Sequence, residues 1–461
     1  MTENLFKKDI SFPSYSGPND NFISLINKTT LIICNWFSNS EKNGPLPIEE
    51  NIKYLMPDDP GYQNDNLFEE IESLITNSYN PVHPGSLAHL DPPPLIFSIV
   101  GDLIAASLNN NLLAYELSPS VTLLEEALIN WFSKKIGFGD LSGGIFASGG
   151  TLSNLNALIA ARNNAGLCSD PNAVFLISED AHSSFTKFTR IMGLDENNLL
   201  KIKTDNEGCM DLINLTNVIE QCYVENKRIF SIVATVGTTI RGAIDPIKEI
   251  ADICEEKNIW LHIDGSIGGI YGITNIKIKG LNNISRANSI TINPQKILGI
   301  TKTSSLLLVS NIDYLRNTFS TGLPYISSPK NIINRGELGI QGSRPAEVIK
   351  LWLGLRYLGT SGIEHILRTS LDRRSFLEKN LDKTKFEIYS GPLHIISFLP
   401  KGMSSKESNT WTYDKRIELM KNNFMLSRPE FKGIYILRAV MGNYNTSENH
   451  INELLNLLNN K

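Results

Sequence analysis

A lysine, Lys296, follows directly after a predicted strand, and a lysine in that position can carry chemistry. Three β-branched residues in Ser289–Asn293 favour a strand, and Pro294 stops it. In open α/β sheets, ligands bind outside the carboxyl ends of the strands. A partly desolvated lysine there loses its proton more easily, and its free amine can form a Schiff base with an aldehyde. Taken alone, the same lysine also fits a solvated surface charge.

A second strand end carries glycines in front of a predicted helix. The run Gly143–Ala147 is largely apolar, Gly149 and Gly150 follow, and a helical pattern begins soon after. Glycines let backbone amides approach a ligand, and a helix N-terminus offers unpaired N–H groups, so the segment can bind a phosphate. Thr151 and Ser153 can add hydroxyl groups. The pattern is neither G-x-G-x-x-G nor a P-loop, and a plain helix cap explains it equally well.

Strands and helices alternate through the middle of the chain. The predicted strands are Ala173–Ser178, Leu199–Lys203, Ile229–Val236, Ile259–Asp264, Ser289–Asn293 and Ser305–Ser310. The predicted helices are Phe97–Leu108, Val121–Ile136, Phe185–Met192, Asp211–Asn226 and Pro246–Lys257. This order predicts an α/β fold with a mostly parallel sheet and helices on both of its faces.

The chain divides into three predicted parts. Residues 1–70 are polar and turn-rich around one apolar segment, which indicates an arm that packs on something else, such as a second subunit. Residues 71–344 are expected to form the large domain, and residues 345–461 a smaller α+β domain. The smaller domain is expected to contain a helix at Ala346–Leu358 and a strand at Gly433–Val440.

The composition excludes several classes of protein. The net charge of -5 and a pI near 5.9 argue against a nucleic-acid binder. The five cysteines are scattered without metal-ligand spacing, which favours reduced thiols in the cytoplasm and no metal site. The first residues lack the apolar core of a signal peptide, and the apolar stretches are too short or broken to cross a bilayer. We therefore expect a soluble cytoplasmic protein.

Polar residues gather at the predicted strand ends, and together they meet the demands of pyridoxal 5'-phosphate. The phosphate needs a glycine-rich helix start, and the aldehyde needs a lysine amine. The pyridine nitrogen accepts electrons only while protonated, for which Asp264 offers a carboxylate. His182 can stack on the ring, and Thr238 can bond the ring hydroxyl. Each also has a structural explanation, as a bonded histidine or a helix cap.

The chain also resembles a known family, the group II pyridoxal-phosphate-dependent amino-acid decarboxylases of the aspartate aminotransferase-like fold (fold type I). The resemblance runs from about residue 79 to the end. It is carried by Asn109–Asn111, Glu116–Pro119, Ser148–Asn154, Ala181–Ser184, Ala234–Thr239, His262–Asp264, Asn293–Lys296, Gln341–Arg344 and Lys350–Leu353.

The resemblance implies a role for each matching residue. Lys296, Asp264, His182 and Tyr325 are the expected catalytic residues, with Tyr325 in a loop as the proton donor; a packed surface tyrosine is the alternative there. The expected cofactor ligands are Gly149, Gly150, Thr151, Thr238, Asn293, Gln295 and Lys296. Arg344 is expected to bind the substrate carboxylate.

Two loop histidines and two departures from the family pattern complete the expected site. His83 and His89 lie in a proline-rich segment and can line the side-chain pocket or shape a turn. Gln295 stands where the family has histidine, and its amide can still donate to phosphate. Gly265 stands where the family has alanine, which predicts a looser fit around the ring.

The predicted function is decarboxylation of an L-amino acid to a primary amine, by a homodimer with active sites at the subunit interface. An acidic or diamino substrate is favoured by overall resemblance, since no motif names the side-chain pocket. An aldehyde synthase or another carbon–carbon lyase is an alternative on the same cofactor. A non-catalytic protein that binds the cofactor is the alternative from another class.

Overall fold

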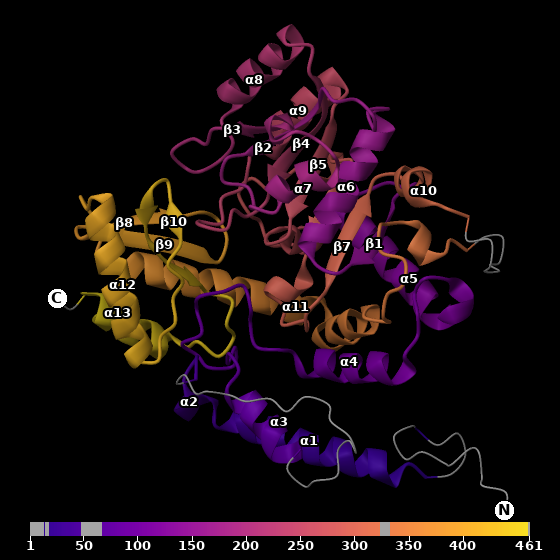
Figure 1. Cartoon of the computed structure of the whole chain (residues 1–461). Helices are drawn as coiled ribbons and strands as arrows, with labels where there is room; N and C mark the ends of the chain where they lie inside the picture. The colour runs from indigo at the N-terminus through magenta and orange to yellow at the C-terminus, as the bar shows by residue number, and fades with distance from the viewer. Residues whose placement is uncertain (1–12, 14–17, 48–66, 323–331, 460–461) are drawn as a thin grey trace, which may run out of the picture.

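The computed structural model describes residues 13, 18–47, 67–322 and 332–459. Tyr325, the expected proton donor, lies outside the described residues. Figure 1 places a large sheet with its helices in the centre, a smaller C-terminal unit (yellow) at one side, and the helices α1, α3 and α4 below.

Seven strands of the described chain form the large sheet, in the order β1-β7-β6-β5-β4-β2-β3. They are β1 (Gly143–Ala147), β2 (Ala173–Ser178), β3 (Leu199–Ile202), β4 (Arg228–Thr235), β5 (Trp260–Gly265), β6 (Ser289–Ile292) and β7 (Ser305–Val309). β7 runs antiparallel to both of its neighbours, and the strands from β6 to β3 pair in parallel. The predicted mostly parallel sheet is therefore confirmed.

Helices cover both faces of this sheet, because its strands carry apolar side chains on both sides. In β2, Val174 and Leu176 belong to one core cluster, whereas Phe175 and Ile177 belong to another. The first face is covered by α5 (Pro119–Ile136), α8 (Leu212–Val224) and α9 (Ile247–Lys257); the second by α6 (Gly150–Asn164), α7 (Phe185–Ile191) and α10 (Asp313–Phe319). Where the sequence predicted one of these helices, the helix ends in the structure lie within about two residues of the predicted ends.

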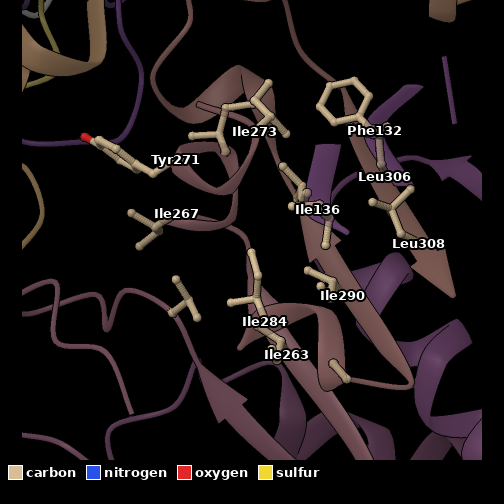
Figure 2. Close-up of a cluster of buried hydrophobic side chains, with 14 of the residues drawn as sticks. Phe132, Ile136, Ile263, Ile267, Tyr271, Ile273, Ile284, Ile290, Leu306 and Leu308 are labelled. Atoms are coloured by element: carbon tan, nitrogen blue, oxygen red, sulfur yellow. The ribbon is translucent and has the colours of Figure 1, made fainter. Parts of the chain in front are cut away.

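The larger of the two cores lies on the first face. Figure 2 shows Phe132 and Ile136 of α5 close to Ile290 of β6 and to Leu306 and Leu308 of β7. All five side chains are buried. This packing holds β6 firmly in the sheet, so the turn that follows β6 starts from a rigid base.

The C-terminal unit is an antiparallel sheet covered by helices. Its strands are β8 (Phe386–Ser390), β9 (Ile395–Pro400) and β12 (Leu437–Val440), in the order β12-β9-β8, and its helices are α12 (Ser405–Lys421) and α13 (Glu448–Asn459). A further short pair joins β10 (Glu430–Phe431) and β11 (Ile434–Tyr435). The predicted strand Gly433–Val440 is therefore two short strands interrupted at Ile436.

The long helix α11 (Val348–Asn380) continues for about six turns beyond Leu358, where the predicted helix Ala346–Leu358 ends. Gly359 has φ 61 and ψ 178, which kinks the helix without ending it. The first half packs against α4, and Leu377 in the second half joins the core of the C-terminal unit. The domain boundary at residue 345 stays a prediction, since α11 belongs to both parts.

The N-terminal helices leave a large apolar surface exposed. α1 (Asp20–Ser38) has no buried residue, and α2 (Ser40–Asn43) and α3 (Leu67–Thr76) follow it. α4 (Ile96–Leu108) exposes Ile96, Val100 and Leu103 in addition to its buried face. Such a surface is unusual on a monomer. No helix among the described residues has both the length and the apolar character that crossing a bilayer requires.

Candidate active site

The carboxyl ends of four parallel strands bring the predicted residues to one edge of the sheet. His182 follows β2, Thr238 follows β4, Asp264 lies near the end of β5, and Lys296 follows β6. Asp264 interacts electrostatically with both His182 and Lys296. The structure therefore brings together the groups that the sequence places at separate strand ends.

Lys296 ends a single 3-10 turn, Pro294–Lys296, that follows β6 directly. Its backbone N–H donates to the carbonyl of Asn293 at 3.1 Å. Burial lowers the pKa of the Lys296 ammonium, and the carboxylates of Asp264 and Asp91 oppose that shift. A lowered pKa provides more of the free amine at neutral pH, which is the form that attacks a carbonyl carbon.

Asp264 is held in the middle of the sheet, paired in register with Thr235 of β4 and Thr291 of β6. Only 5% of the residue is exposed, and its Oδ1 accepts the backbone N–H of Ser266 at 3.1 Å. One oxygen is thus fixed by the backbone, which leaves the other oriented and able to bind a cation or a protonated ring nitrogen.

His182 is a neutral ring at physiological pH. Burial lowers the pKa of its imidazole. Its Nδ1 accepts the backbone N–H of Ser184 at 3.2 Å and lies 2.8 Å from the hydroxyl of the same residue, so the ring proton belongs on Nε2. A neutral, fixed imidazole is suited to stack on an aromatic ring.

The glycines before α6 form a cradle whose shape excludes a side chain. Gly149 has φ +96, and a Cβ on Gly150 would lie 2.6 Å from Ser266 Oγ and 2.7 Å from Asn293 Nδ2. The first turn of α6 points unpaired N–H groups to the same place. These donors, with the side-chain amide of Asn293, fit a phosphate group. Lys296 and Asp264 then fit the aldehyde and the ring nitrogen of the same cofactor.

The hydroxyl groups near the cradle have distinct environments. Thr238 is buried, and its Oγ1 accepts the N–H of Ala243 at 3.1 Å, which leaves its own proton to donate. Thr151 is exposed at the start of α6. Ser153, which could add a hydroxyl to the cradle, lies fully buried 2.8 Å from the hydroxyl of Ser305. Its role toward a phosphate stays a prediction.

Asn293 and Gln295 flank the lysine turn with different partners. Asn293 is buried, and its Oδ1 accepts the hydroxyl proton of Ser305 at 2.6 Å, which turns its amide toward Gly150. Gln295 Oε1 accepts the backbone N–H of Ser304. Its amide NH2 remains the donor, so its role toward phosphate stays a prediction.

Gly265 is tightly packed, which corrects the expected looser fit. A Cβ there would lie 2.7 Å from the carbonyl oxygen of Thr291 and 3.0 Å from the Cα of Gly269. Thr291 is in the central strand β6, so it cannot move aside freely.

We predict that Gly265→Ala lowers the free energy of unfolding by about 1–3 kcal/mol through overpacking. Urea unfolding measures this, with Gly139→Ala as the control, since no atom lies within 4 Å of a Cβ at Gly139. Equal stability of the two variants would contradict the prediction.

The two loop histidines lie in different surroundings. His83 is buried, its Nδ1 accepts the N–H of Gly85 at 2.9 Å, and its carbonyl accepts the Asn443 amide at 2.7 Å. It therefore shapes the turn. His89 is exposed and interacts electrostatically with Asp91 and Arg438, which also interact with Lys296. Of the two, only His89 is connected to the lysine in this way.

Arg344 has a buried partner within the protein. Its Nη2 donates to both carboxylate oxygens of Glu125, at 2.9 and 2.8 Å, and neither side chain is more than 1% exposed. Glu125 also accepts the N–H of Phe146 in β1, at 3.4 Å. This pair ties Arg344 to α5 and, through Glu125, to the strand β1 that enters the glycine cradle. Binding of the substrate by Arg344 stays a prediction, in surroundings that differ from those expected.

Arg438 was missed by sequence reasoning and lies at the site. Its Nη1 donates to the carbonyl of Thr239 at 2.8 Å, directly after Thr238, and its Nη2 donates to the carbonyl of Ala88 at 2.9 Å. It interacts electrostatically with Lys296. The sequence feature that could have revealed it is an arginine inside the apolar strand Leu437–Val440, because a charged residue is rarely buried unless it has partners.

A buried histidine supports the strand that carries Asp264. Trp260 Nε1 donates to Ser289 Oγ at 2.8 Å, so that hydroxyl donates to His262 Nδ1, also at 2.8 Å. The Nε2–H of His262 then donates to Asn154 Oδ1 at 3.0 Å. This network joins α6, β5 and β6 beneath the cofactor cradle. Asn154 was part of a matched motif, and His262 preceded Asp264, but neither had an expected role.

We predict an acid-labile fold because of His262. Burial lowers its pKa to about 4, whereas an unfolded histidine titrates near 6.5. The neutral ring therefore stabilises the folded state fully above pH 6.5, and this contribution is lost as the pH falls toward 4. The loss amounts to about 3 kcal/mol of unfolding free energy. Urea unfolding between pH 7 and pH 4 measures it.

Two variants isolate the contribution of His262 to acid lability. His262→Gln keeps hydrogen bonding but does not titrate, so its stability is expected to depend less on pH than that of the wild type. His365→Gln, on an exposed side chain, is the control. An unchanged pH dependence in His262→Gln would assign the acid lability elsewhere, first to His394, whose pKa is lowered by burial to about 3.

Comparison with known proteins shows to which family the chain belongs. Residues 48–398 match the family described as the pyridoxal-dependent decarboxylase conserved domain. The chain belongs to this family. It is thus a pyridoxal-phosphate-dependent carboxy-lyase that acts on an amino acid, and the resemblance noted from its motifs is confirmed.

Several characterised relatives are similar over most of the chain. An aromatic-L-amino-acid decarboxylase of Bacillus atrophaeus is 29% identical over 405 residues, covering 86% of this chain and 83% of the relative. The acidic amino acid decarboxylase GADL1 of Xenopus tropicalis is 31% identical over 364 residues, covering 76% of this chain and 70% of the relative.

Solved structures support the fold. Mouse CSAD in its apo form has a TM-score of 0.88 at 23% identity, covering 96% of this chain and 98% of the other. Oryza sativa TDC with PLP and tryptamine has a TM-score of 0.89 at 20% identity, covering 97% and 98%. The fold is therefore that of the fold type I decarboxylases.

Proposed function

We propose that this decarboxylase uses Lys296 to hold its cofactor and Asp264 to keep the cofactor ring protonated. The observation that carries this assignment is the desolvated Lys296 amine beside the Asp264 carboxylate at the edge of a parallel sheet. His182 offers a flat neutral ring next to both. The glycine cradle and Asn293 offer donors for the phosphate.

When bound, pyridoxal phosphate supplies an electron sink for the pair of electrons that the departing carboxylate leaves behind. The residues of this chain contribute positions and charges. Asp264 presents its carboxyl group at a fixed place, and Thr238 keeps one hydroxyl proton to donate. Tyr325 stays the predicted donor of the returning proton.

We propose that Arg438, rather than Arg344, binds the substrate α-carboxylate. Arg344 already binds Glu125 through its Nη2 in a buried pair, while its Nε and Nη1 have no hydrogen-bond partner among the described residues. Arg438 donates one N–H from each of its three nitrogens, to Ser427, Thr239 and Ala88. A guanidinium has five N–H groups, so one remains on each terminal nitrogen. These two N–H groups are available for a carboxylate, which a guanidinium can bind with two hydrogen bonds.

We also propose a cytoplasmic homodimer. The groove between α1 and α4 is lined by Phe22, Ile23, Leu103 and Ile104, all of them at least 39% exposed. A second copy of the chain would cover this apolar surface, and the predicted arm at residues 1–70 includes α1. All five cysteines are free in the described chain, as expected in a reducing compartment. Analytical ultracentrifugation tests the dimer.

The test of the proposed chemistry starts from the purified protein with added pyridoxal phosphate. Borohydride reduction followed by peptide mapping is expected to place the adduct on Lys296. Incubation with amino acids is then expected to release carbon dioxide and an equal amount of amine. Aldehyde with ammonia would indicate the aldehyde-forming alternative, and an adduct without turnover would indicate a non-catalytic binder.

A further inference from the structure

A fully buried carboxyl group, that of Asp245, lies at the base of the turn that carries Thr238. Its Oδ2 accepts the backbone N–H of Thr235 at 2.7 Å, and its Oδ1 accepts the backbone N–H of Met210, also at 2.7 Å. The residue has no solvent exposure. Both oxygens of the carboxyl group are therefore bound by backbone donors from two separate segments, the end of β4 and the loop before α8.

No cation pairs with this group within the described chain. Asp245 forms no ion pair there, and its main electrostatic interactions with charged groups are with two further carboxyl groups, those of Asp180 and Asp205. Burying a carboxylate without a cation costs free energy unless hydrogen bonds replace its hydration. The two backbone hydrogen bonds supply that replacement, and their structural consequence is a fixed position for the two donors.

Asp245 closes the turn by a pair of hydrogen bonds with Thr235. In addition to the bond that its side chain accepts, the N–H of Asp245 donates to the carbonyl of Thr235 at 3.0 Å. The next residues along the turn, Val236 and Ile244, form an antiparallel bridge. The two ends of the turn are therefore held together at the point where the chain leaves β4.

The same pairing continues as far as the hydroxyl group of Thr238. The N–H of Thr238 donates to the carbonyl of Ala243 at 3.0 Å, and the N–H of Ala243 donates to Thr238 Oγ1 at 3.1 Å. The N–H of Gly242 donates to the carbonyl of Thr238 at 2.9 Å. The position of the Thr238 side chain thus depends on Ala243, which belongs to the arm of the turn that Asp245 fixes.

The base of the turn also adjoins the strand that carries Asp264. Thr235 pairs in register with Asp264, and the N–H of Val236 donates to the carbonyl of Asp264 at 2.9 Å. The hydrogen bonds between Asp245 and Thr235 therefore hold the turn against β5 as well as closing it.

We infer that Asp245 is a positioning residue, which acts through Thr238 and not on the cofactor itself. By holding the base of the turn, it fixes the place of the Thr238 hydroxyl. A carboxylate suits this task because each of its two oxygens accepts a hydrogen bond, whereas an amide has one acceptor and would turn its own N–H toward the second donor. The inference rests on the proposed role of Thr238 and adds the residue on which that role depends.

The affinity of the full chain for pyridoxal phosphate measures this role without turnover. We expect Asp245→Asn to raise Kd about 10- to 100-fold, because one backbone N–H loses its acceptor and the turn opens. Asp245→Ser, which keeps one acceptor and leaves room for a water, should have an intermediate effect. Unchanged Kd in both variants would overturn the inference. Loss of folding in both would also overturn it, because Asp245 would then support the whole domain and not one turn.

A carboxyl group with a similar pair of bonds provides the control. Asp205 Oδ1 accepts the backbone N–H groups of Glu207 and Cys209, each at 2.9 Å, and its side chain is exposed. Asp205→Asn keeps that acceptor oxygen, so it should bind pyridoxal phosphate as the wild type does. A loss of affinity in Asp205→Asn equal to that in Asp245→Asn would mean that the effect is not specific to the Thr238 turn, and would contradict the assignment.

A double-mutant cycle distinguishes positioning of Thr238 from general support of the fold. Thr238→Val removes the hydroxyl and keeps the shape of the side chain. If Asp245 acts through that hydroxyl, Asp245→Asn should raise Kd by no more than about 2-fold further in the Thr238→Val background. An equal rise in both backgrounds would overturn the inference. Wild-type affinity in Thr238→Val alone would show that the proposed role of Thr238 is wrong, and the inference would fall with it.

Discussion

Lys296→Ala is expected to lower kcat for carbon dioxide release by about 10⁴-fold or more, because it removes the group proposed to hold the cofactor covalently and to release it to the substrate. The structure supports a large effect, since burial lowers the pKa of Lys296 and so leaves more of this amine unprotonated at neutral pH than an exposed lysine would have. The measurement is single-turnover release of carbon dioxide with saturating cofactor.

A matched control separates loss of chemistry from loss of folding. Lys248 lies on the exposed side of α9 and pairs with Asp252, so Lys248→Ala should retain wild-type turnover. In Lys296→Ala, borohydride should no longer fix the cofactor to the protein, while circular dichroism stays unchanged. Substantial turnover in Lys296→Ala, or an adduct on another lysine, would contradict the assignment.

The parallel sheet explains why much of the site could be predicted from the sequence. Lys296, Asp264 and His182 each follow an apolar run that is buried in the structure, and parallel strands bring such positions to one edge whatever the intervening helices do. The glycines before α6 could also be recognised in the sequence, because only a residue without a Cβ fits beside Ser266 and Asn293.

Residues supplied by domain packing could not be predicted in this way. Arg438 reaches the carbonyls of Thr239 and Ala88 from the C-terminal unit, and its separation from Ala88 in sequence is about 350 residues. Strand periodicity predicts that Arg438 lies in a strand, but it does not predict what that strand faces. Arg344 was found from its motif, but a motif match cannot reveal that Glu125 is its partner.

Predictions made from short sequence patterns were wrong where packing against distant residues determines the structure. The predicted helix ended at Leu358, yet α11 continues through a kink at Gly359 because its two halves bury apolar side chains on different domains. Gly265 was expected to leave space, yet the carbonyl of Thr291 in the neighbouring strand fills it. Neither contact is encoded within a few residues of the glycine.

Asp264→Asn is expected to lower kcat by about 10²- to 10⁴-fold, because an amide cannot keep the ring nitrogen of the cofactor protonated. The carboxylate is fixed by the N–H of Ser266 and by its place between β4 and β6, so no nearby group can move in to replace it. Asparagine has nearly the same shape, which keeps the packing intact. Steady-state release of carbon dioxide measures the effect.

The same variant separates holding the cofactor from activating it. Asp264 raises the pKa of Lys296, so its removal increases the free amine and should leave the borohydride-stable adduct on Lys296 in place. Asp264→Asn is therefore expected to bind the cofactor covalently but turn over slowly, whereas Lys296→Ala does neither. Asp252→Asn, on exposed α9, should behave as the wild type. Full activity of Asp264→Asn would show that ring protonation does not depend on this carboxylate, and loss of the adduct would show that Asp264 acts mainly in building the site.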